Sequence, residues 1–356
     1  MIKKRCRWVD VAKGISIILI VLGHIYTDPV LRRPIYAFHV PIFFFLAGVV
    51  EKNEKMKFKD KVFKDFKAIM LPYYVVGFLS IILFTVIGEK IFVLLGRDVS
   101  NYHNLAQSAG FMDSLWGMLY GNSKLGNMQW NLPLWFLPCF FATKLLFFLL
   151  EKIIHGNEKR RCASIVLLFF YTAIINSNTM RICLPCHLET AINMLIWYEI
   201  GFLIKPRVLD ENTIQNIRNR KVLFGGIALL LITVSTIGAF SNGSIQVRID
   251  QYSNTILYYL VGGSYIVSVI LISILFEQSE KFQFIGQHSM IILLLHKFPV
   301  VIFQLVFKSL LQTSNYVIIT VLGIVLAILS AFLCILADML LKKCQFHQKT
   351  MTTKST

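Results

Sequence analysis

Three residues near the start of the chain, an aspartate, a lysine and a histidine, have types and a spacing that suit acid–base chemistry. Lys13 and His24 are eleven residues apart, which on an α-helix is about 1,100° of rotation, roughly 20° from whole turns, and about 16 Å along the axis. Both side chains would therefore leave the same face of a helix. Asp10 would lie about 40° from His24 on that face, where it could hold Lys13 in place.

His39 follows His24 after a short link. If each histidine lies near the outer end of its own membrane helix, the two imidazoles share a similar depth on antiparallel neighbours. Neutral histidine suits proton transfer because its ordinary pKa lies near working pH. A single histidine such as His39 or His296 could instead bond a backbone carbonyl and join two helices, and Lys13 alone could extend to the lipid headgroups.

Ionisable side chains elsewhere in apolar segments are further candidates, because a charge at the centre of a membrane helix costs roughly 2.5 to 3.5 kcal/mol on insertion scales. Lys144, Glu199 and the pair His296-Lys297 are of this kind. For Lys144 and Glu199 the pattern favours a structural role or a side chain that reaches the headgroups.

The elements that position these residues are membrane helices. The chain has 356 residues, 56% hydrophobic and 15% charged, with a mean hydropathy of +0.65, whereas soluble domains average roughly 45 to 50% apolar and about 25% charged. This composition excludes a disordered chain and an ordinary soluble enzyme. A spanning helix needs about 20 mostly apolar residues, and ten segments qualify: 11–27, 34–50, 69–88, 133–150, 163–177, 188–204, 221–240, 255–276, 288–308 and 317–341.

The basic residues indicate an orientation. Most of the 36 Lys and Arg fall in alternate connecting segments, and such residues are retained on the cytoplasmic side. We therefore expect an all-α integral membrane protein with about ten transmembrane helices and both termini cytoplasmic. It comprises one multi-pass domain over residues 1–345 and a short polar tail over 346–356. The net charge of +17 then reflects topology and contact with anionic lipid, and no nucleic-acid partner is expected.

Residues 183–187, Cys-Leu-Pro-Cys-His, fit the pattern of covalent haem attachment. A haem must be enclosed, however, and this loop of about ten residues joins two predicted helices without a surrounding domain. An external disulfide or a simple loop is the preferred interpretation.

Ordered motifs along most of the chain resemble the acyltransferase 3 family of bacterial multi-pass O-acyltransferases, and the Asp-x-x-Lys-Gly start is most similar to the subgroup called fucose 4-O-acetylase-like. The matching segments are Asp10 to Ile15, Val21 to His24, Phe38 to Gly48, Leu71 to Tyr73, Leu134 to Pro138, Trp197 to Gly201, and Phe284 to Ser289 followed by His296. Many members carry arginine where this chain has Lys13, and lysine lacks arginine's bidentate fork.

The resemblance implies a bacterial cytoplasmic-membrane enzyme that transfers an acyl group, usually acetyl, from cytoplasmic acyl-CoA to a hydroxyl of a cell-surface glycan or its lipid-linked precursor. His24 would be the general base, and Lys13, Lys64 and Lys67 would bind the acyl donor. Supporting or acceptor-pocket roles are expected for Asp10, His39, Trp135, Glu199 and His296. No metal or bound cofactor is expected, and glycan-assembly proteins are possible partners.

Two other functions fit the same composition. One is a transporter or glycan exporter, although the sequence shows neither the internal repeat nor the helices broken near the midplane that carriers often have. The other is a non-catalytic partner in a glycan-assembly complex, for which substitutions of Lys13 and His24 would be silent.

Overall fold

The computed structural model describes residues 6–52, 56–84, 88, 90, 93, 110–125, 130–177, 182–313 and 315–352. Within these ranges the chain is helical, and the only paired extended backbone is a bridge between Gln246 and Gln251. The longer helices are α1 (Arg7–Ile25), α3 (Pro41–Val50), α5 (Leu71–Ile82), α8 (Phe111–Tyr120), α9 (Phe136–Ile154), α10 (Glu158–Ser177), α11 (Leu188–Val208), α13 (Lys221–Asn242), α14 (Thr255–Leu275), α17 (Lys297–Val306) and α19 (Tyr316–Thr352). The shorter ones are α2 (Pro29–Tyr36), α4 (Phe58–Asp65), α12 (Glu211–Asn219), α15 (Glu280–Gln287), α16 (Ser289–Leu295) and α18 (Lys308–Leu311).

Seven helical segments in this part of the chain are long and apolar enough to cross a membrane, or eight if a bent pair counts as one span. The seven are Arg7–Ile25, Pro29–Val50, Phe58–Ile82, Leu132–Ile154, Lys221–Asn242, Thr255–Leu275 and Tyr316–Lys343. The all-helical prediction is therefore confirmed, and so is a set of membrane-length helices, but the count of ten is not.

Two of the predicted spans, now α10 and α11, are helical but do not pass as spans on length and apolarity. Their polar side chains are paired inside the protein: Glu199 of α11 forms an ion pair with Arg161 of α10, and Asn193 donates to Asp250. Ionisable groups inside a bundle are expected to face its interior and to pair in this way.

The predicted continuous span at residues 288–308 is wrong. Helices α16 and α17 are bent by 53° at His296, so this segment is a broken span or a re-entrant loop. The sequence indicated no helix broken near the midplane of the membrane, and the bend between α16 and α17 corrects this expectation. Broken helices at membrane depth are tolerated where neighbouring protein satisfies the freed backbone groups.

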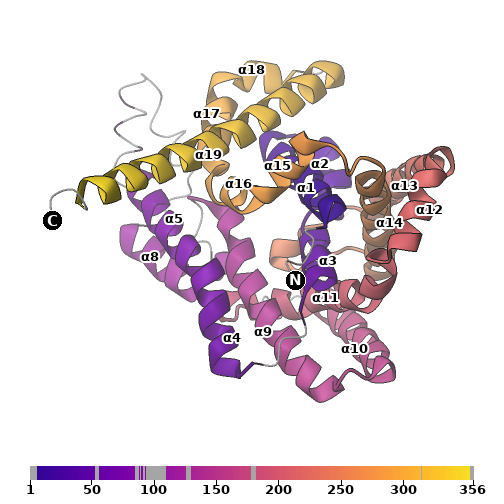
Figure 1. Ribbon diagram of the computed structural model, residues 1–356. Coiled ribbons are helices and arrows are strands. Elements are labelled where there is room, and N and C mark those ends of the chain that lie inside the picture. Colours follow the sequence, from indigo (N-terminus) through magenta and orange to yellow (C-terminus); the bar gives the residue numbers. More distant parts are fainter. Residues whose placement is uncertain are drawn as a thin grey trace.

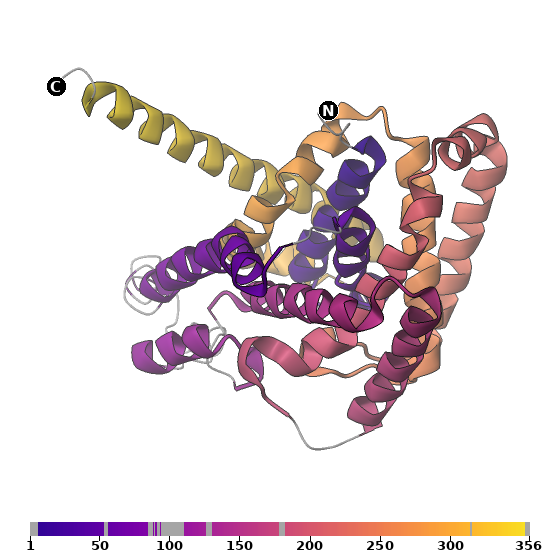
Figure 2. The same cartoon turned by 60° about the horizontal axis from the view of Figure 1, so that its bottom comes forward.

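Helix α1 lies at the centre of the bundle, with α13 and α14 on one side and α4, α5 and α8 on the other (Figure 1). Most residues of α1 are buried, whereas α13 buries only Ala228, Ser235, Ala239 and Asn242. The C-terminal part of α19 extends away from the other helices (Figure 2). The exposed apolar faces of α13 and α19 are those expected of helices that contact lipid.

Glycines set the closest helix crossings. A Cβ on Gly48 of α3 would lie 2.1 Å from the carbonyl oxygen of Tyr198, and one on Gly201 of α11 would lie 2.1 Å from that of Phe45. Gly14 of α1 and Gly286 of α15 approach equally closely. Small residues allow membrane helices to pack backbone against backbone, so these glycines fix α3 on α11 and α15 on α1.

Candidate functional site

Helix α1 presents Lys13 and His24 on one face, as the spacing predicts. Lys13, Ile17 and Ile20 line a cavity of about 260 Å³, and His24 is the next residue on that face, one turn beyond Ile20. The stripe predicted from the sequence is therefore the wall of a cavity that ends one turn short of His24.

The cavity lies between several helices and is mostly apolar. Besides the three α1 residues, its lining comprises Phe43, Ala47, Val50 and Glu51 from α3 and its end, Ala68 and Ile69, Phe136, Leu137, Phe140 and Lys144 from α9, Tyr198 from α11, and Ser289, Met290 and Leu293 from α16. Pockets for whole small molecules measure roughly 300 to 1,000 Å³. This cavity therefore suits the flexible arm of a ligand better than a complete nucleotide.

A π-helical turn contributes Ala68 and Ile69 to the wall. It covers Phe66–Met70 and joins α4 to α5. π-Helical turns are rare and occur frequently at functional sites, because the extra residue re-aims the side chains that follow.

Charged groups gather at one end of the cavity, which we call the Glu51 end. Lys144 Nζ lies 3.2 Å from an Asp65 carboxylate oxygen and 3.9 Å from one of Glu51. Lys61 contacts the same two carboxylates at 3.0 and 3.2 Å. Tyr198 donates its hydroxyl to Glu51. Two lysines thus offset two carboxylates in this cluster, and Lys13 adds an ammonium group to the cavity wall beside it.

A histidine pair lies beyond the other end. Leu293 is the last cavity residue of α16, and His296 follows it by one turn. The rings of His24 and His296 are in contact, with centroids 5.3 Å apart. His24 is half-buried, whereas His296 is fully buried.

His39, the ring expected to meet His24, lies in the turn between α2 and α3. Its Nδ1 bonds the carbonyl oxygen of Ile35 at 2.8 Å, and its ring packs on Tyr36 with centroids 4.8 Å apart. The ring in contact with His24 is instead that of His296.

The other sequence-predicted residues lie outside the cavity wall. Lys64 and Lys67 are exposed on the segment that contributes Ala68 and Ile69, and Lys67 lies 5.8 Å from the ring centroid of Phe63.

Asp10 is buried on α1, where its backbone carbonyl meets Gly286. Glu199 is buried in the ion pair with Arg161, and Trp135 lies edge-on to His187, with centroids 5.3 Å apart. Trp135 therefore packs against a member of a second polar cluster, which is described next.

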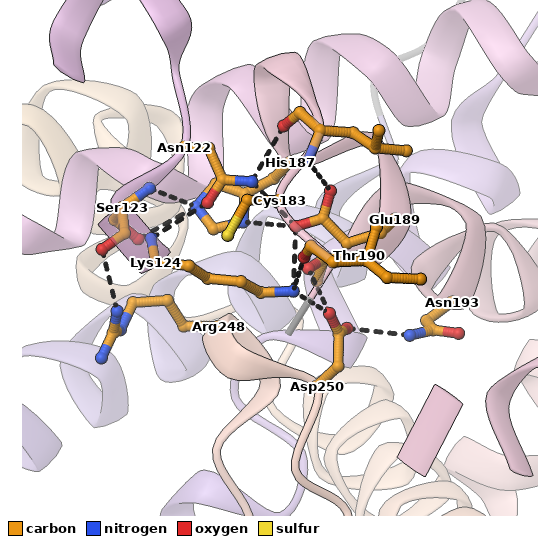
Figure 3. Close-up of polar contacts among 12 residues, drawn as sticks. Asn122, Ser123, Lys124, Cys183, His187, Glu189, Thr190, Asn193, Arg248 and Asp250 are labelled. Atoms are coloured by element: carbon orange, nitrogen blue, oxygen red, sulfur yellow. Dashed lines mark hydrogen bonds and ion pairs between the residues drawn. The ribbon is translucent and has the colours of Figure 1, made fainter. Parts of the chain in front are cut away.

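This second cluster is buried and joins three loops (Figure 3). We call it the loop cluster; it comprises Asn122, Ser123, Lys124, His187, Glu189, Thr190, Asn193, Asp250 and Tyr252. Lys124 contacts Glu189 at 2.9 Å and also pairs with Asp250. Burial and nearby Lys124 and Arg248 lower the pKa of His187 well below its ordinary value, burial having the larger effect. His187 is therefore neutral at pH 7.

The loop cluster contains the residue types of a nucleophilic triad in Ser123, His187 and Glu189. Their contacts, however, connect the loops and serve a structural role. His187 Nε2 accepts both the backbone N–H and the hydroxyl of Ser123, each at 2.9 Å. Ser123 is 1% exposed, and no member of the loop cluster lines the cavity. Since Nε2 is occupied, His187 does not offer that nitrogen to a haem iron, which agrees with the interpretation of residues 183–187 as a loop.

Sequence reasoning missed Glu51, Tyr198 and Gln304. Glu51 begins a polar stretch that contains seven lysines and three other acids. Nothing in its sequence context therefore indicates that it lines a cavity. Tyr198 reads as one more apolar residue of its helix. Gln304 donates to the carbonyl oxygens of His24 and Ile25 at 2.8 and 3.2 Å, and only its polarity within an apolar segment could have drawn attention.

A family model described as an acyltransferase domain, of the acyltransferase 3 type, matches residues 7–336. No curated protein and no solved structure matches the chain.

Proposed function

Because the chain belongs to the acyltransferase 3 family, whose model covers it almost from end to end, we propose that it is a membrane O-acetyltransferase. It moves an acetyl group from acyl-CoA to a hydroxyl of a cell-surface glycan or its lipid-linked precursor, as does the fucose 4-O-acetylase-like subgroup that it resembles. The family establishes an acyltransferase; the donor, the acceptor and the roles of residues are the proposal.

One observation carries this proposal: an apolar cavity begins at Lys13 and stops one turn from two histidine rings in contact. The Glu51 end would face the cytoplasm, with both chain termini on that side in the inner membrane of a bacterium. The CoA phosphates would lie at that end near Lys13, with Lys64 and Lys67 on the surface beside it. The pantetheine arm would occupy the apolar cavity and bring its thioester toward His24.

His24 would then act as the general base. It takes the proton of the acceptor hydroxyl while the oxygen attacks the thioester carbonyl; the carbon–sulfur bond breaks, and the proton leaves with the CoA thiolate as a thiol. Positioned general bases contribute typically 10²- to 10⁴-fold in rate. The products are the acetyl ester and free CoA, and neither metal nor redox cofactor is needed to balance the reaction.

The test uses purified protein in lipid nanodiscs with radiolabelled acetyl-CoA and the host's glycan precursors. We expect label in the glycan with wild-type protein and a loss of at least about 100-fold with His24→Ala. Mass spectrometry of the glycan should show the acetyl group. Wild-type protein that releases no labelled glycan, or His24→Ala protein of undiminished activity, contradicts the proposal.

A carrier is the second candidate, favoured by the break between α16 and α17 at His296, since transporters often bind their substrates at discontinuous helices. The two functions separate in proteoliposomes. A carrier moves glycan precursor across the bilayer without covalent change, whereas the enzyme yields an ester only when acetyl-CoA is present.

A further inference from the structure

The hydrogen bonds of His296 define its tautomer. Its Nδ1 lies 2.9 Å from the carbonyl oxygens of both Ile292 and Leu293. A carbonyl oxygen only accepts, so Nδ1 carries the hydrogen, and in the neutral ring the lone pair is on Nε2. Neutral His296 therefore cannot donate a hydrogen bond to an oxyanion through Nε2.

The Nε2 atom of His296 is buried and has no hydrogen-bond partner among the described residues. Leaving a buried acceptor unsatisfied costs about 1 to 3 kcal/mol, so such an atom in a native fold calls for an explanation. The neighbouring ring is that of His24, at a centroid separation of 5.3 Å and an interplanar angle of 37°.

The broken span holds both histidines in place. Asn131 donates its side-chain amide to the carbonyl oxygen of Leu294 at 3.2 Å, which satisfies an acceptor near the break. Gln304, on α17 beyond the break, donates to the backbone carbonyl of His24 at 2.8 Å. The same span thus fixes the backbone of one histidine and carries the ring of the other. Lys297, His39 and Arg32 are the other charged or titratable groups near His24.

We infer that His296 is a positioning residue for His24, whose protonated ring donates a hydrogen bond to the Nε2 lone pair of His296. This inference rests on the proposed acyl transfer. When His24 takes the acceptor's proton on one nitrogen, its other N–H points to His296, which orients the ring and stabilises its charge. The proton then leaves with the CoA thiolate, and His296 ends the cycle as it began. The arrangement gives a neutral histidine the place that an aspartate has in a Ser-His-Asp triad.

Two variants separate the nitrogens of His296. In His296→Asn the amide N–H can replace Nδ1 toward the Ile292 carbonyl, but nothing replaces Nε2; in His296→Gln the longer side chain can place an acceptor oxygen near the Nε2 position. His288→Asn is the matched control, because His288 bonds the Phe284 carbonyl through Nδ1 at 2.8 Å in the same way but is only half-buried.

We expect kcat for acetyl transfer to fall at least about 10-fold in His296→Asn, with KM for acetyl-CoA within twofold of wild type. His296→Gln should recover part of the loss, and His288→Asn should match wild type. A His296→Asn protein with wild-type kcat overturns the inference, and so do equal losses in the Asn and Gln variants, which would mark a purely structural role.

A second measurement does not depend on catalysis. Diethyl pyrocarbonate modifies neutral imidazole, and mass spectrometry of the peptide that contains His24 follows its modification against pH. The midpoint of this profile should move to lower pH in His296→Asn and stay unchanged in His288→Asn; an unchanged midpoint in His296→Asn overturns the inference. If wild-type protein transfers nothing from acetyl-CoA, the proposed function fails while this profile still decides the role of His296.

Discussion

Lys13 of α1 and Lys144 of α9 line the same cavity, although 131 residues of the sequence separate them. Lys144 is held by the carboxylates of Asp65 and Glu51, so its charge is already offset. Lys13 lies on the helix that carries His24, and we expect it to contribute to the binding of an anionic donor.

The first prediction concerns Lys13. Lys13→Met should weaken CoA binding roughly 10- to 100-fold, since a hydrogen bond to a charged group contributes about 1.5 to 3 kcal/mol, whereas Lys13→Arg should bind within a few-fold of wild type. Isothermal titration of nanodisc protein with CoA measures both. Lys308→Met, which removes one exposed lysine elsewhere, controls for net charge. Equal affinities for Lys13→Met and Lys308→Met would remove Lys13 from the donor site.

The second prediction concerns acyl length. Ile20 lies at the cavity end nearest His24, so Ile20→Val should open space for a longer acyl chain there. One methylene in an apolar pocket is worth about 1 to 3 kcal/mol, and the ratio of kcat/KM for propionyl-CoA over acetyl-CoA should rise about 10-fold. Ile25→Val is the control, because Ile25 is buried on the same helix but away from the cavity lining. An unchanged ratio in Ile20→Val would place the acyl group elsewhere.

The third prediction tests the glycine crossings. Gly201→Ala puts a methyl group 2.1 Å from the carbonyl oxygen of Phe45, and overpacking of this kind costs about 1 to 3 kcal/mol or more. The melting temperature in detergent should fall by several degrees. Gly226→Ala, on α13 with nothing within 4 Å of the new methyl group, should leave it equal or raise it, because alanine favours helix by up to about 1 kcal/mol. Similar melting temperatures for the two variants would show that α3 and α11 do not pack at Gly201.

The fourth prediction concerns the loop cluster. Lys124→Met leaves the buried carboxylates of Glu189 and Asp250 without their ammonium partner, and breaking a buried ion pair costs about 3 to 5 kcal/mol. Lys342→Met breaks an exposed pair with Asp338 on α19, and exposed pairs are worth about 0 to 1 kcal/mol. Thermal unfolding should therefore separate the two variants clearly, and a Lys124→Met protein as stable as Lys342→Met would contradict the described pairing.

The fifth prediction is a pH dependence. Burial holds the pKa of His187 well below its ordinary 6.5, so below that pH the unfolded chain binds a proton that the native protein does not. The stability that depends on neutral His187 is fully present above pH 6.5 and is lost as the pH falls, by up to about 1.4 kcal/mol per pH unit.

Comparing melting temperatures at pH 7.5 and 5.5 tests this expectation. The decrease should be smaller in His187→Gln, which has no titrating ring, than in wild type and in the control His288→Gln, which removes a half-buried histidine. Equal decreases in all three proteins would show that His187 is not the source of the dependence.

The parts of the fold that depend on local periodicity were predictable. The helix that carries Lys13 and His24, and their shared face, follow from the spacing of residues on one helix. The break at His296 was not predictable, because Pro299 is the only local break signal and the freed acceptor at Leu294 is satisfied by Asn131, far away in sequence.

The sequence by itself determined that this is a helical membrane chain of the acyltransferase 3 type and that a lysine and a histidine share one face of its first helix, because composition, hydropathy and helical period are local properties. Only the tertiary structure decided which ring meets His24, which lysine and carboxylates surround the cavity, and that His187 belongs to the buried loop cluster. Each of these features depends on side chains that are brought together by packing between helices remote in sequence. Such contacts produce no periodic pattern of residues, so the sequence alone does not reveal them.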